Sequence, residues 1–130
     1  TLAIIERDAQ RLPASALPRA FFQSTILDVP KHRSKHGCML VNTVLELADV
    51  DPALNQLATD KLAAIESAFA QAFQRAQQSG ELGLAHSPRE LASVVMTINL
   101  GLRVQSRKNP SRQTLQTMID NSLSMLGLAA

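Results

Sequence analysis

The stretch from Ser87 to Lys108 places the strongest constraint on how this chain can fold. Ser87, Pro88 and Glu90 form a helix start, in which serine caps the first turn, proline takes the first helical position and glutamate completes a capping box. One apolar stripe at spacings of three and four consists of Leu91, Val94, Val95, Ile98 and Leu102, and a second group outside it consists of Ala92, Met96, Leu100 and Val104. A surface helix of a monomer shows a single apolar stripe. We therefore infer that a second copy of the chain covers part of this helix.

The other apolar patterns predict an all-α fold with one domain over residues 1–130. Aromatic residues are limited to four phenylalanines, so the core must be built from aliphatic side chains of the kind that helix bundles use. No segment alternates with a period of two for long enough to form a strand. The predicted helices span residues 2–12, 18–29, 38–48, 51–79, 87–108 and 111–126, with Gly80 as a C-terminal stop.

Charge and cysteine content exclude several classes of protein. The net charge of +2 gives no electrostatic footprint of a nucleic-acid-binding surface. One cysteine excludes an intramolecular disulfide and fits a reducing compartment. No apolar run approaches the ~20 residues that span a bilayer, and no signal peptide opens the sequence. We expect a cytoplasmic protein with no membrane contact. The sequence begins inside a helical pattern, which suggests a fragment.

The sequence does not support catalysis, a metal site or a cofactor. His32, His36 and His86 fall in predicted loops, away from a nucleophile and without metal-ligand spacing on a helix. The basic loop over residues 31–36 could contact an anion, but a solvated connection between helices is favoured because no second basic stripe extends it.

The phenylalanines suggest a pocket. Phe21 and Phe22 share one predicted helix, and Phe69 and Phe73 lie four residues apart on another. Asn42 and Asn99 interrupt very apolar helices, where a buried amide needs partners or lines a cavity. Apolar walls with a few fixed polar groups describe a small-molecule site, although an ordinary filled core remains the alternative.

Several motifs resemble those of TetR/AcrR-family ligand-binding domains. The segment Gly37-Cys38-Met39-Leu40-Val41-Asn42 is similar to the family's Gly-Cys-Leu-Leu/Val-x-Asn motif. The Asp51-Pro52 turn before a long helix and the segment Gly101-Leu102-Arg103-Val104 also match, over roughly residues 21–128. The resemblance implies a homodimeric regulator whose last two helices pair, with operator DNA bound by an N-terminal helix-turn-helix that these residues do not contain.

These inferences give two sets of candidate residues. The effector, a small hydrophobic or amphipathic molecule, is expected to contact Phe22, Ile26, Asn42, Phe69, Phe73, Met96, Asn99 and Arg103. The dimer interface is expected to use Leu91, Val95, Ile98, Leu102, Leu115, Met118, Ile119, Ser122 and Leu126. The leading hypothesis is an effector-binding and dimerisation domain of a repressor. The alternative is an all-α dimerisation or adaptor domain with a filled core and no ligand.

Cys38 is open to two interpretations. Its predicted position at a helix start, after Lys35 and His36, would lower the pKa of the thiol and favour redox sensing. Its apolar neighbours favour a buried, inert side chain. We expect structural packing rather than redox activity.

Overall fold

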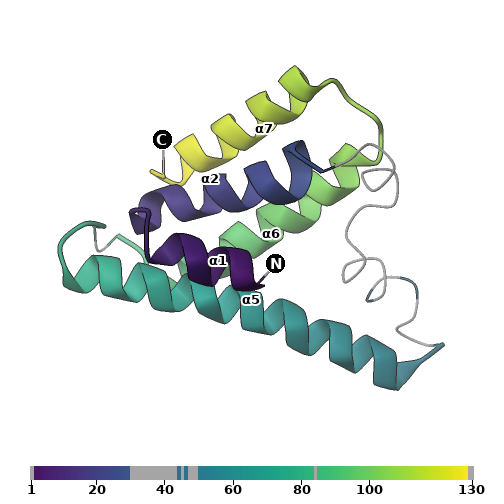
Figure 1. Cartoon of the computed structure of the whole chain (residues 1–130), viewed down its shortest axis with the longest axis horizontal. Coiled ribbons are helices and arrows are strands. Elements are labelled where there is room, and N and C mark those ends of the chain that lie inside the picture. The colour runs from purple at the N-terminus through teal and green to yellow at the C-terminus, as the bar shows by residue number, and fades with distance from the viewer. Residues whose placement is uncertain (1, 30–43, 45, 47–49, 84, 129–130) are drawn as a thin grey trace.

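The computed structural model describes the chain except for residues 1, 30–43, 45, 47–49, 84 and 129–130 (Figure 1). The described residues form helices and turns without a strand, which confirms the all-α prediction. The α-helices are α1 (Leu2–Ala9), α2 (Leu17–Phe22), α5 (Pro52–Gln78), α6 (Pro88–Ser106) and α7 (Arg112–Met125). A short 3-10 helix, η1 (Ala14–Ala16), precedes α2, and a π-helix, η2 (Gln23–Leu27), follows it. Apart from Val44 and Glu46, the predicted helix over residues 38–48 lies outside the described residues.

The three long helices begin where the sequence predicts. In each, a side chain before the first turn accepts a hydrogen bond from a main-chain N–H three residues later: Asp51 from Leu54, Ser87 from Glu90 and Ser111 from Thr114, all at 3.1 Å. These bonds satisfy N–H groups that have no partner inside the helix. The start of α6 is therefore fixed by local sequence.

Glycine ends α5 and α7 in the same way. Gly80 follows α5 with a φ of +81°, and Gly127 follows α7 with a φ of +73°. After α5, the N–H of Glu81 donates to the carbonyl of Ala76 at 2.8 Å, and the N–H of Leu128 makes the equivalent bond to Leu123 at 2.9 Å. This is the Schellman arrangement, which requires a left-handed residue that glycine adopts at little cost.

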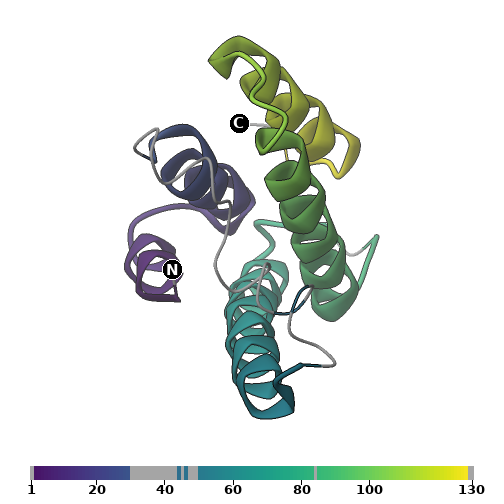
Figure 2. The same cartoon turned by 90° about the vertical axis from the view of Figure 1, so that its right-hand side faces the viewer.

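The helices pack around one hydrophobic core. α5 and α6 form the most extensive helix pair, α1 lies against α5, and α2 lies between α1 and α7 (Figure 1). Seen from the side, α6 and α7 lie next to one another on the side of the molecule away from α1 (Figure 2). The layers leave one face of α6 and one face of α7 without cover from the described part of the chain.

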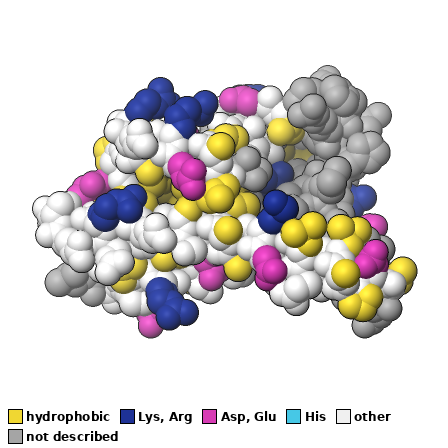
Figure 3. Space-filling model, turned by 60° about the horizontal axis from the view of Figure 1, so that its bottom comes forward, with side chains coloured by type: hydrophobic (Ala, Val, Ile, Leu, Met, Phe, Trp, Pro, Cys, Tyr) yellow, Lys and Arg dark blue, Asp and Glu magenta, His cyan; other side chains and the backbone are white. Residues whose placement is uncertain are grey.

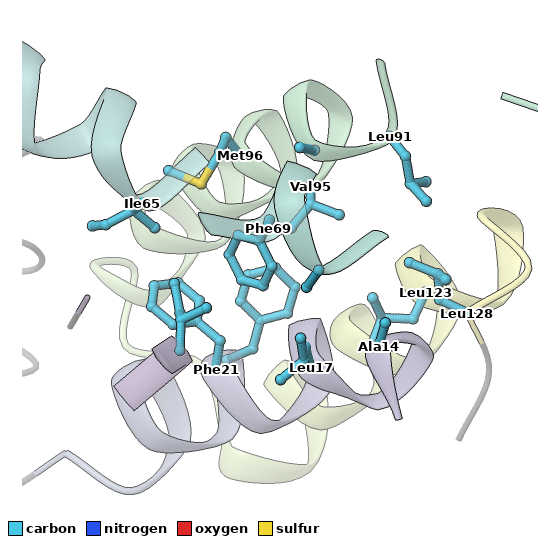
Figure 4. Packing of buried hydrophobic residues seen from close by; sticks show 14 of the residues in the cluster. Ala14, Leu17, Phe21, Ile65, Phe69, Leu91, Val95, Met96, Leu123 and Leu128 are labelled. Carbon is cyan, nitrogen blue, oxygen red and sulfur yellow. The ribbon is translucent and has the colours of Figure 1, made fainter. Parts of the chain in front are cut away.

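The core is aliphatic with an aromatic centre. Phe21, Phe69 and Met96 meet in its middle, and Leu123 and Leu128 from the end of α7 close one side (Figure 4). The side chains of Phe22, Phe69, Phe73 and Val95 have 0% of their residue surface exposed. Such burial is worth roughly 1.5–3 kcal/mol for each large apolar side chain, so this contact region supplies much of the stability of the fold.

The helix predicted over residues 18–29 differs from expectation. It is α-helical only to Phe22 and then widens into η2, in which the N–H of Asp28 donates to the carbonyl of Gln23, five residues earlier, at 2.9 Å. One sequence feature favours the change. The Thr25 hydroxyl donates to the Phe21 carbonyl at 2.7 Å, an interaction that bends helices.

The first turns of α5 extend past the core. Leu54 and Leu57 are 42% and 52% exposed, and Val50 just before the helix is 75% exposed. Figure 3 shows the face of the molecule along α5, where hydrophobic side chains alternate with charged ones. None of the helices among the described residues has both the length and the apolar content needed to cross a membrane.

Candidate functional site: the aromatic core and the outer face of α6

The four phenylalanines form one cluster, as their spacing predicts. The rings of Phe21 and Phe69 meet edge to face with centroids 5.4 Å apart, and Phe69 stacks on Phe73 at 6.0 Å. Phe22 lies 6.0 Å from Phe21 in a tilted arrangement. Contacts of this geometry are worth about 0.5–1.5 kcal/mol beyond the area they bury. The cluster therefore ties α2 firmly to α5.

The structure brings most of the predicted effector-contacting residues to this cluster. Phe22, Ile26, Phe69, Phe73 and Met96 belong to the same buried core. Asn99 and Arg103 are also buried, with 2% and 8% of their surfaces exposed, one and two turns after Met96 on α6. The remaining candidate, Asn42, lies outside the described residues.

Asn99 and Arg103 connect α6 to the π-helix. The Arg103 Nη1 donates to the carbonyl of Thr25 at 2.9 Å, and its Nε donates to Oδ1 of Asn99 at 3.4 Å. The amide of Asn99 thus orients the guanidinium, and the guanidinium satisfies a carbonyl at the C-terminal end of a helix. Positive charge is favoured at that end because the helix dipole leaves it partly negative.

Arg112 binds the same helix end from α7. Its Nη1 donates to the carbonyl of Leu27 at 2.9 Å, and its Nη2 pairs with the Asp28 carboxylate at 2.8 Å. Gln23 also donates to Asp28. The hydrogen bond from Arg112, together with that from Gln23, holds the pKa of Asp28 below its ordinary value. Two arginines from different helices therefore converge on η2.

A second ion pair joins the other end of the α2–α7 seam. Nη1 of Arg19 donates to Oδ1 of Asp120, which also accepts a hydrogen bond from Gln116. The hydrogen bond from Arg19, followed by that from Gln116, lowers the pKa of Asp120. The two ion pairs therefore join α7 to Arg19 of α2 and to Asp28, which directly follows η2.

Three cavities among the described residues lie outside the aromatic cluster. The first, about 590 Å³, is an open groove between α5 and the start of α6, lined mainly by polar and small side chains that include Glu66, Gln71 and Arg89. A second cavity of about 220 Å³ lies between the α1–α2 connection and the end of α5, and a third of about 340 Å³ lies along α7. None of these three is lined by a predicted effector-contacting residue.

Most of the predicted dimer-interface residues are covered by their own chain. Five of them have between 0% and 8% of their surface exposed: Leu91, Val95, Leu102, Leu115 and Ile119. The other four are half-buried: Ile98, Met118, Ser122 and Leu126. The fully buried members stabilise the core of one copy and offer almost no surface to a second.

Four apolar side chains of α6 and α7 face outward. On α6 these are Val94, Leu100 and Val104, with 42%, 41% and 51% of their surfaces exposed. On α7, Met125 is 87% exposed. The sequence does contain a sign of them, because Val94, Leu100 and Val104 belong to the excess of apolar residues around α6. The predicted interface residues Leu91, Val95 and Leu102 lie on the inward side of the same helix.

No group of three or more histidine, cysteine or acidic side chains in the described part of the chain is arranged to hold a metal ion. His86 is exposed. His32, His36 and Cys38, with the basic loop over residues 31–36, lie outside the described residues, so the interpretations given to them remain predictions.

Comparison with known proteins identifies one family. A family model described as "Tetracyclin repressor-like, C-terminal domain" matches residues 16–121. This match runs from the last residue of η1 into α7, and so includes the aromatic cluster and both arginines that bind η2. No curated protein and no solved structure matches the chain at a significant level.

Proposed function

Since this chain belongs to the family of tetracycline repressor-like C-terminal domains, we propose that it is the effector-binding and homodimerisation domain of a transcription repressor. In this proposal two copies pair through α6 and α7. A small hydrophobic or amphipathic effector changes the geometry of the pair, and operator DNA, bound by a helix-turn-helix outside these 130 residues, is released.

The exposed apolar side chains of α6 carry the dimerisation part of the proposal. Val94, Gly101 and Val104 follow one another at spacings of seven and three, so they share one face of the helix, with Leu100 beside them. Figure 2 shows that α6 and α7 lie together on one side of the molecule. Pairing of this side with a second copy would give a four-helix bundle and cover these side chains.

The revised interface follows from burial. We assign it to the outward side chains of α6 and α7: Val94, Ile98, Leu100, Val104, Met118 and Met125. The fully buried members of the earlier set, such as Leu115 and Ile119, would then support the interface from below. Gly101 has open space where a side chain would start, which would let a partner helix approach closely.

The oligomeric state tests the proposal. Val104→Glu places a charge on the proposed interface, where desolvation would make it costly, and should convert the dimer to a folded monomer in sedimentation velocity. Leu57→Glu is the matched control, because Leu57 is exposed to the same extent, 52% against 51%, but lies on α5. A Val104→Glu protein that stays fully dimeric at micromolar concentration would contradict this placement.

The effector part of the proposal is supported by the chemistry of the core beside α6. An apolar, aromatic wall meets the amide of Asn99 and the guanidinium of Arg103, which is the combination that orients amphipathic ligands. Because the described aromatic side chains are closely packed, an effector at this place must displace some of their contacts. The effector would shift the equilibrium between the packed and the displaced arrangement only to the extent that it binds the displaced one more tightly.

A filled-core dimerisation domain without a ligand is the second candidate, and the complete burial of Phe22, Phe69 and Phe73 favours it. A thermal-shift screen with hydrophobic acids, alcohols and arenes separates the two. A saturable rise in melting temperature that Phe73→Leu alters, but Leu57→Ala does not, supports effector binding. The absence of any such compound favours the filled core.

A further inference from the structure

The connection between α2 and the last two helices is made through main-chain carbonyls of a π-helix. Between Phe22 and Asp28 the helix carries the wider hydrogen-bond pattern, in which the Asp28 N–H reaches the Gln23 carbonyl. Wide turns of this kind are rare and occur often at functional sites. The question is what holds the chain in this register.

An α-helical register is available to the same residues. In that register the Asp28 N–H would donate to Ser24 instead of Gln23, and the Thr25 carbonyl would accept from the N–H of Val29. The change advances the chain by one residue, so everything after the wide turn rotates by about 100° relative to α2. Asp28 would leave its present position beside α7.

The contacts from α6 and α7 favour the π register. In a π-helix the Thr25 carbonyl would need the N–H of residue 30, which is proline and has none. Arg103 supplies a donor to that carbonyl at 2.9 Å. In this register Arg112 also donates to the Leu27 carbonyl and the Asp28 carboxylate, at 2.9 and 2.8 Å.

We propose that Gln23–Leu27 is a two-register switch whose π state is held by Arg103 of α6 and Arg112 of α7. A movement of α6 or α7 that withdraws either guanidinium favours the α register, and the turn after η2 rotates. A change at α2 is transmitted to α6 and α7 by the same contacts, since coupling between two sites is reciprocal. That this coupling reaches the dimer interface rests on the proposed function, whereas the register equilibrium does not.

The first test reads the hydrogen bonds of the 130-residue chain directly. Scalar couplings across hydrogen bonds, measured by NMR, show which carbonyl the Asp28 N–H contacts. In the unmodified chain the coupling should go to Gln23. In Arg112→Gln, at least a tenth of the population should couple to Ser24 instead or give a second set of signals for residues 23–28.

The matched control is Arg89→Gln, which removes the same charge from an exposed position at the start of α6, on the groove with α5. It should leave the Gln23–Asp28 coupling unchanged. An Arg112→Gln protein that keeps this coupling alone and at full size would overturn the proposal.

The second test uses a deletion that removes the wide turn. Deleting Ser24, which is half-buried, leaves the residues on either side in place but joined by a regular α-helix. The Thr25 carbonyl then has the Val29 N–H as a main-chain partner. Arg103→Lys, with one ammonium in place of the planar guanidinium, should raise the unfolding equilibrium constant about tenfold in the unmodified chain, but less than threefold in the deletion background.

The double-mutant cycle isolates this difference, because every other interaction of Arg103 contributes equally to both backgrounds. Denaturation by urea at one fixed protein concentration gives the unfolding equilibrium constants of the unmodified chain, the two single variants and the double variant. If the two changes are independent to within a factor of two, the arginine does not select the register and the proposal fails. The measurement requires neither an effector nor DNA, so it can fail while the proposed function stands, and the reverse also holds.

Discussion

Replacing Phe69 by alanine tests whether the aromatic cluster is the energetic centre of the fold. Phe69 has no exposed surface and contacts both Phe21 and Phe73. Truncation of a buried phenylalanine costs about 3–5 kcal/mol, from lost transfer energy and the cavity that remains. Two ring contacts, each worth about 0.5–1.5 kcal/mol beyond burial, place the expected loss near the upper end, at about 4–5 kcal/mol.

This loss predicts a large change in melting temperature. The unfolding entropy of about 2.1 cal/mol/K per residue, over 130 residues, makes 1 kcal/mol equivalent to about 4 °C. The variant should therefore melt about 16–20 °C lower in calorimetry. Because oligomerisation raises the apparent stability, both proteins must be compared at the same concentration.

Leu57→Ala is the control on the same helix. Leu57 is half exposed, so its truncation should change stability by no more than about 0.5 kcal/mol. If Phe69→Ala melts within 4 °C of Leu57→Ala, the close packing of the cluster is refuted. An apolar cavity of this kind stays dry and takes up benzene-sized molecules, so benzene should restore part of the lost stability in Phe69→Ala alone.

Three further predictions concern single contacts. Burial raises the pKa of Asp8, but hydrogen bonds from Arg11 and then Arg7 outweigh this effect, so the pKa in the folded chain lies below 3.8. In urea denaturation the unmodified chain should therefore be more stable than Asp8→Asn by its full margin above about pH 5, and this margin should disappear as the pH falls through the folded pKa. Ser87→Ala removes the acceptor for the Glu90 N–H and should cost about 1 kcal/mol, measured by thermal melting against Ser87→Asp, which keeps the cap. Gly80→Ala places a side chain at a φ of +81° in otherwise open space, so backbone strain alone should cost about 1 kcal/mol in urea denaturation, and no loss would contradict the left-handed turn.

The sequence determined the elements that depend on neighbours in the chain. The starts of α5, α6 and α7 follow from Asp51, Ser87 and Ser111, and the end of α5 follows from Gly80, because caps and left-handed turns are local interactions. Phe69 and Phe73 share one face of α5, because a spacing of four residues places side chains on one helix face, and the rings of α2 meet that face through Phe21, as predicted. The motifs around Asp51-Pro52 and Arg103 also led to the family that the comparison confirmed.

The tertiary structure decided which side of α6 is buried. The helix is apolar nearly all round, so periodicity alone did not distinguish the inward Val95 and Leu102 from the outward Val94 and Val104. Their partners on α2, α5 and α7 are distant in sequence. The π-helix was equally hidden, because its register depends on Arg103 and Arg112, which follow Thr25 and Leu27 by 78 and 85 residues. Within the local sequence only the Thr25 hydroxyl favours the wide turn, whereas Arg103 and Arg112 are donors that only the folded chain brings within reach.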